Sequence, residues 1–214
     1  MKKKIVSLVL VFALALALGI GGTVAWLTAQ TSEVVNTFTV GDIEIELTET
    51  GTDDAGKKNY SFIPGDKLAK DPKVTVKANS EACWVFVKVN EAHNTHTALP
   101  SGEKIINWSV ASDWTQVVDG STKYNVWYKE FAATGDTPVS KYILTGDGTG
   151  EYANGFVTVN GNVTEVIAES IDGDAEGENK PQLTFDAFAH QSKNTNIETA
   201  TAAALAHFAA ETNQ

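Results

Sequence analysis

The chain has 214 residues, a formal net charge of −11 and a single cysteine, Cys83. It contains no arginine, the side chain best suited to bidentate contacts with phosphates and base edges, so we do not expect it to bind nucleic acid. A single cysteine excludes an intramolecular disulfide. We therefore expect the core to stabilise the fold unaided, with Cys83 as a small buried residue within it.

The first 25 residues have the three-part pattern of a secretory signal peptide. Lys2 to Lys4 are basic, residues 5–18 are apolar except for one serine, and Thr23-Val24-Ala25 places small residues before the expected cut. We expect cleavage between Ala25 and Trp26. The apolar run is shorter than the roughly 20 residues of a membrane-spanning helix, and an uncleaved N-terminal anchor is the alternative.

Residues 26–214 are then expected to form a single secreted domain. Short apolar or alternating segments separated by Gly, Asp, Asn and Pro turns predict strands through most of it. Residues 83–90 are apolar on both faces, as in a central strand, and Asn160-Gly161 is expected to be a hairpin turn. The expected strands are residues 34–40, 42–48, 73–78, 83–90, 105–114, 124–131, 156–159, 163–171 and 183–189, and residues 139–144 are a short apolar segment between two loops.

The alanine-rich residues 195–210 are the one segment of this domain that predicts a helix. Asn194, Thr195 or Asn196 is the expected N-cap. The expected apolar stripe consists of Ala202, Leu205, Phe208 and Ala209. Many short strands followed by one helix predict an all-β fold, an antiparallel β-sandwich or jelly roll with a short C-terminal helix.

Two groups of residues are weak candidates for metal binding. His93 and His96 stand three residues apart in a polar loop, but a zinc site needs a third protein ligand, and the helical H-E-x-x-H arrangement is absent. Asp172, Asp174 and Glu176 begin an acidic loop that resembles half of a calcium loop, but Leu183 replaces the bidentate glutamate. We expect solvated loops at both places, no cofactor and no enzymatic activity, with weak Ca²⁺ binding as the alternative.

Several segments in fixed order resemble the TasA/camelysin family of Gram-positive bacteria. After the signal, an N-T-F-x-x-G turn precedes an alternating strand, and further likeness follows in the first half and at the C-terminal end. The segments are Asn36–Gly41, Phe62–Asp66, Lys73–Val76, Trp84–Val89 and Leu183–Gln191. The middle of the chain, about residues 90–180, has no such likeness.

This resemblance implies a secreted structural protein with a jelly-roll fold. It also implies processing by a SipW-type signal peptidase and assembly into fibres of the extracellular biofilm matrix. The expected partners are other copies of the chain, joined head to tail, or related matrix fibre proteins. We expect the protein to contact the membrane only during export. The expected location is the extracellular matrix or the cell surface.

The resemblance further implies that residues 26–38 act as a donor strand, which adds to the sheet of the next subunit. The candidate anchors of this polymerisation are Trp26, Leu27, Val34, Val35 and Phe38. The alternative is that this strand pairs within its own domain. Two other functions stay open: a secreted camelysin-like metallopeptidase that uses His93 and His96, and a monomeric cell-surface adhesin domain.

Overall fold

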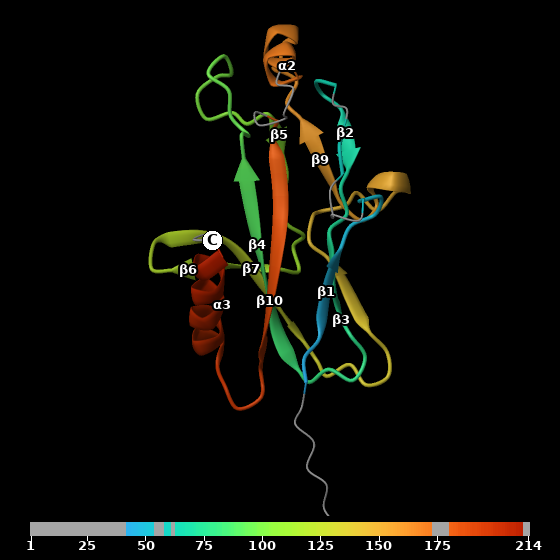
Figure 1. Cartoon of the computed structure of the whole chain (residues 1–214), viewed down its shortest axis with the longest axis vertical. Coiled ribbons are helices and arrows are strands. Elements are labelled where there is room, and N and C mark those ends of the chain that lie inside the picture. The colour runs from blue at the N-terminus through green and yellow to red at the C-terminus, as the bar shows by residue number, and fades with distance from the viewer. Residues whose placement is uncertain (1–41, 54–57, 61–62, 173–179, 212–214) are drawn as a thin grey trace, which may run out of the picture. The chain divides into compact units, whose positions relative to one another are not determined.

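The computed structural model of the protein describes residues 42–53, 58–60, 63–172 and 180–211. These residues form strands of two to ten residues, with a short 3-10 helix and two α-helices (Figure 1). The elements are β1 (Ile45–Thr48), β2 (Lys67–Ala69), β3 (Lys73–Val76), β4 (Cys83–Ala92), β5 (Ile106–Asn107), β6 (Thr115–Asp119), β7 (Thr122–Phe131), β8 (Val139–Tyr142), η1 (Gly150–Tyr152), β9 (Phe156–Val159), α2 (Glu165–Asp172), β10 (Gln182–Gln191) and α3 (Ile197–Glu211).

The strands form three antiparallel sheets, with the orders β10-β4-β7-β6, β1-β3-β8 and β2-β9-β5. One face of the four-stranded sheet packs against β1-β3-β8 near one end and against β2-β9-β5 and α2 near the other. Helix α3 covers the opposite face (Figure 1). The prediction of an all-β antiparallel sandwich with a short C-terminal helix is confirmed.

The sequence of β4 is apolar on both faces because both faces of the strand are covered. Cys83, Val85 and Val87 point into the core between the two sheets, and Cys83 is fully buried. Phe86 points the other way, against α3. Burial raises the pKa of the Cys83 thiol to about 11, so the residue is an inert part of the core, as the sequence predicted.

The C-terminal helix is confirmed, with a different buried stripe. The Asn196 side chain accepts a hydrogen bond from the Thr199 amide at 2.9 Å and caps the helix. Ala200, Ala204 and Phe208 are buried against the sheet. The expected stripe was wrong at Ala202 and Ala209, which are exposed. The buried stripe starts at Ala200, two residues before the expected start at Ala202, and follows the 3.6-residue period from there.

The predicted strand at residues 163–171 was also wrong, because residues 165–172 are helix α2. Val163, Ile167 and Ile171 are buried at a spacing of four, which is a helical period. The Asn160-Gly161 hairpin was therefore wrong as well, and this turn leads from β9 into α2.

The predicted strand at residues 105–114 is reduced to β5 and an isolated bridge between Val110 and Leu144. A turn ends it, in which the Trp114 amide donates to the Ala111 carbonyl at 3.1 Å, and the next strand, β6, begins only at Thr115. The indole of Trp114 donates to the Tyr142 carbonyl at 2.9 Å. The segment around Trp114 is therefore a turn rather than part of a strand.

Candidate functional site

Strand β10 is a long strand at the edge of the four-stranded sheet. Within the described part of the chain it pairs only with β4, along all ten of its residues. An edge strand leaves alternate N–H and C=O groups without a partner, and proteins usually protect such edges with lysines, prolines, bulges or short length. Gln182–Gln191 contains neither lysine nor proline, so none of these devices protects its edge.

The other outer strands are protected better. Strand β6, at the opposite edge of the same sheet, has five residues and a register shift between Gln116 and Val118. The outer strands of the two smaller sheets have two to four residues each. Among the described residues, β10 is thus the edge best suited to receive another strand.

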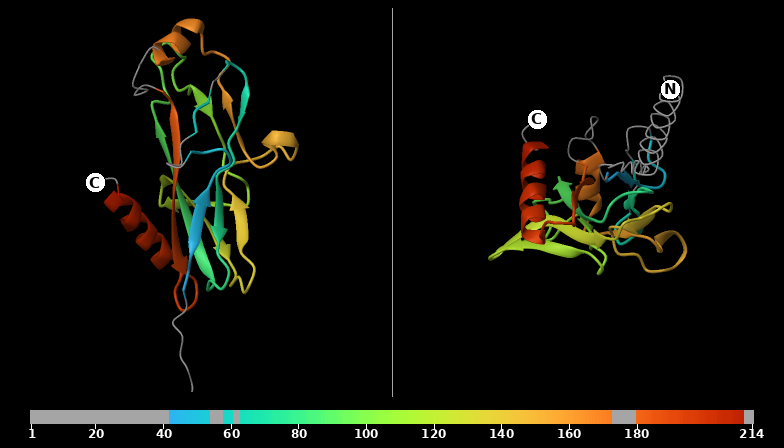
Figure 2. Two further views of the ribbon diagram at one scale, coloured as in Figure 1. Left: turned by 45° about the vertical axis from the view of Figure 1, so that its right-hand side comes forward. Right: turned by 90° about the horizontal axis from the view of Figure 1, so that it is seen from below.

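Strand β1 is the outer strand of the facing sheet and contacts β10 on the same side of the sandwich (Figures 1 and 2). The inward side chains of both strands are partly buried and pack against the same core cluster. We call these two edges and their inward side chains the β1/β10 flank. The side chains are Ile43, Ile45 and Leu47 from β1 and the residues just before it, and Phe185, Ala187 and Ala189 from β10.

The start of β1 lies at one end of this flank. Just before β1, the Asp42 carbonyl accepts a hydrogen bond from the Glu81 amide at 2.9 Å. Just after β10, the Ser192 amide donates to the Ala82 carbonyl at 2.9 Å. Because Glu81 and Ala82 are neighbours, β1 begins where β10 ends, and the two strands run in opposite directions.

A buried polar cluster lies at the other end of the flank. Lys70 pairs with Glu49 at 2.8 Å, and both side chains are only 11% exposed. The Tyr60 hydroxyl lies 2.7 Å from Glu49, and the Lys70 ammonium lies 5.4 Å from the Phe185 ring centre. Burial and the hydrogen bond to Glu49 raise the pKa of Tyr60, so its hydroxyl stays protonated. The cluster ties the chain after β1 to β10, and removing one partner would leave an unpaired buried charge.

A second carboxylate, that of the partly buried Glu91, fixes the loop after β4. Both of its oxygens accept hydrogen bonds from Lys104, at 2.8 and 2.6 Å, and it also accepts one from the Trp108 indole. Burial alone would raise the pKa of Glu91, but these bonds and the nearby positive charge lower it overall. The carboxylate is thus held ionised in a structural role.

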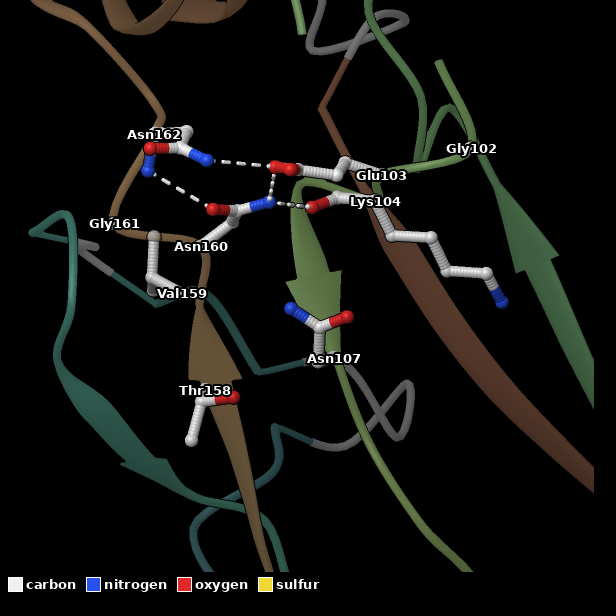
Figure 3. A pocket seen from close by; sticks show the side chains of 9 residues that line it. All are labelled: Gly102, Glu103, Lys104, Asn107, Thr158, Val159, Asn160, Gly161 and Asn162. Carbon is white, nitrogen blue, oxygen red and sulfur yellow. Dashed lines mark hydrogen bonds between the residues drawn. The ribbon is translucent and has the colours of Figure 1, made fainter. Parts of the chain in front are cut away.

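A shallow polar hollow lies between the loop before β5 and the turn after β9 (Figure 3). One oxygen of Glu103 accepts hydrogen bonds from the side-chain amides of Asn160 at 2.8 Å and Asn162 at 2.9 Å. These two bonds lower the pKa of Glu103. Asn107 and Thr158 lie on the neighbouring strands β5 and β9 and complete the lining. The hollow offers oriented amides but no nucleophile beside a base, which acyl transfer would require.

The two candidate histidines are not joined by a third ligand. Nδ1 of His96 accepts a hydrogen bond from the Ala98 amide at 3.1 Å, and Nε2 lies 3.1 Å from the Ser170 hydroxyl. His93 is exposed in a left-handed turn with φ of 54°. Among the residues that the structure describes, no group of three or more His, Cys, Asp or Glu side chains is placed to hold a metal ion. Asp172 ends α2, whereas Asp174 and Glu176 lie outside the described residues.

The predicted cleavage site and donor strand also lie outside the described residues. This applies to Ala25 and to all five candidate anchors, Trp26, Leu27, Val34, Val35 and Phe38. The sequence did not reveal the β1/β10 flank, although it gave the inward faces of both strands. No helix in the described part of the chain is long and apolar enough to cross a bilayer.

Comparison with known proteins gives no match to a protein-family model, to a curated protein or to a solved structure.

Proposed function

We propose that the protein is a secreted structural subunit of extracellular matrix fibres, in which the N-terminal strand of one copy adds to the β1/β10 flank of the next. The observation that carries the proposal is the ten-residue outer edge of β10, which is unpaired among the described residues and contains no lysine or proline. An added strand would pair with this edge through main-chain hydrogen bonds, which supply affinity without requiring a particular sequence.

The side chains of the flank support an apolar donor. Ala187 and Ala189 are small, so they would not obstruct larger side chains on an added strand. Residues 26–38 carry such side chains, the five candidate anchors named above. Covering the partly buried isoleucines and Phe185 would add hydrophobic stabilisation, at about 25 cal/mol for each Å² removed from water.

The positions of donor and acceptor favour a filament. The proposed donor, residues 26–38, precedes β1 in the chain, whereas the acceptor is the edge formed by β1 and β10, so the contact joins two different surfaces. A head-to-tail contact of this kind propagates unless its rotation closes a ring. Copies of this chain, or of related matrix fibre proteins, are the proposed partners. A SipW-type signal peptidase is the proposed processing enzyme, and the matrix or cell surface of a Gram-positive bacterium is the proposed location.

The processing step is tested by N-terminal sequencing of the secreted protein, joined to negative-stain microscopy of the same sample. We expect a single N-terminus at Trp26, and filaments in the fraction that carries it, because only cleavage frees the donor strand from the signal. Replacing Ala25 with an aspartate, which a signal peptidase does not accept before the cut, should leave a longer chain without filaments. Filaments built from uncleaved chains would contradict the role of the cut.

A further inference from the structure

The sequence contains two Asn-Gly dipeptides, Asn154-Gly155 and Asn160-Gly161. Such a dipeptide can lose ammonia spontaneously. The backbone nitrogen of the glycine attacks the side-chain amide carbon of the asparagine, a new C–N bond closes a five-membered succinimide, and the amide nitrogen leaves as ammonia with the proton released by the backbone nitrogen. Water then opens the ring to aspartate or isoaspartate. Glycine permits this reaction best because it has no side chain to obstruct ring closure.

The structure holds Asn160 away from this reaction. Its amide nitrogen donates to Glu103 at 2.8 Å and to the Lys104 carbonyl at 2.9 Å. Its side-chain oxygen accepts a hydrogen bond from the backbone amide of Asn162 at 2.9 Å, so both the nitrogen and the oxygen of the Asn160 side chain are fixed (Figure 3). Bringing the amide carbon onto the Gly161 nitrogen would break these bonds.

Asn154 has no such restraint. Its side chain is exposed and, within the described part of the chain, makes no hydrogen bond. The following amide, on Gly155, donates only a long bond of 3.4 Å to the Tyr152 carbonyl. No hydrogen bond among the described residues therefore holds the Asn154 side chain away from the Gly155 nitrogen.

We propose that Asn154-Gly155 is a site of spontaneous deamidation in this protein, and that the Glu103 carboxylate protects Asn160-Gly161 from the same reaction. The modification acts on a tight junction. The Gly155 carbonyl accepts a hydrogen bond from the Lys70 amide at 3.1 Å, and a Cβ on Gly155 would collide with the Lys70 carbonyl oxygen. An isoaspartate at 154 adds one main-chain carbon here, so it displaces Gly155 from Lys70, the partner of Glu49 at the end of the flank.

The reaction is measured by ageing the purified protein in mildly alkaline buffer and mapping its peptides by mass spectrometry. We expect Asn154 to convert at least about tenfold faster than Asn160, because the Asn160 side chain must first break its hydrogen bonds to Glu103, Lys104 and Asn162. Glu103→Ala should accelerate conversion of Asn160 about tenfold and leave the rate at Asn154 unchanged. The matched control is Glu130→Ala, which removes an exposed carboxylate from β7 and should change neither rate.

Equal rates at the two asparagines in the unaltered protein would overturn the proposal. So would a Glu103→Ala variant in which Asn160 stays slow, or one in which both sites accelerate equally, since the latter indicates general loosening. The rate at Asn154 serves as an internal measure of folding in every variant. None of these outcomes depends on whether the protein forms fibres.

Discussion

Deleting Trp26–Val35 from the secreted chain is expected to leave a folded domain that forms no filaments. The buried residues that the structure describes all lie at Lys70 or beyond, and the partly buried residues packed on them begin at Ile43. The deletion therefore removes no part of that core. It does remove four of the five candidate anchors, together with most of the donor backbone. Circular dichroism and thermal melting check the fold, and negative-stain microscopy checks assembly.

A control for this deletion keeps the length of the segment. Thr28→Ala with Ser32→Ala changes two polar residues between the anchors, and assembly should be retained. Filaments of normal length and number from the truncated chain would show that the donor lies elsewhere.

The second large effect is expected on the receiving side. Ala187 lies on the inward face of β10, opposite Val87 of β4, and Ala187→Lys places a charge at the edge that the donor must cover. Inward-pointing lysines are a common natural protection of edge strands. In the free subunit the long side chain can reach water past the edge, but an added strand would bury its ammonium. We expect the concentration needed for assembly to rise at least about tenfold, which corresponds to 1.4 kcal/mol.

Val118→Lys is the matched control for this substitution. Val118 lies on β6, at the opposite edge of the same sheet, and is 52% exposed, so the same charge there should leave assembly unchanged. Sedimentation at a series of concentrations measures both variants, and melting temperatures confirm that both are folded. An equal loss of assembly in the two variants would mean that the added charge acts generally and that the β1/β10 flank is not the surface that receives the donor strand.

Local pattern predicted most of the sandwich because its central strands carry strong signals. The continuous apolar run of β4 and the alternation of Leu183, Phe185 and Ala187 in β10 admit one interpretation each. Residues 163–171 did not, because a short apolar run fits either period. Val163, Ile167 and Ile171 decide in favour of a helix only once their common burial is known. The same holds for Trp114, whose bend is fixed by contact with the distant Tyr142.

The candidate site was predictable only in part. The inward faces of β1 and β10 follow from alternation, but their position at two adjacent edges depends on strand order, which local pattern does not encode. The pair of Glu49 and Lys70 was missed for the same reason, since 21 residues separate its two partners. The different expected deamidation rates of the two Asn-Gly dipeptides could not be predicted from the sequence either, because both dipeptides are identical. The difference comes from the hydrogen bond between Asn160 and Glu103, which lies 57 residues away in the chain.

Hydrogen exchange of the β10 amides, compared between assembled filaments and the truncated monomer, tests the central claim most directly. An edge strand exchanges the amides that face away from its partner, and an added strand protects them. We predict that, on assembly, alternate amides of Gln182–Gln191 become protected, while those of the other edge strand, β6, keep their rates. Unchanged exchange along β10, with new protection on another surface, would contradict the proposal that this edge receives the donor strand.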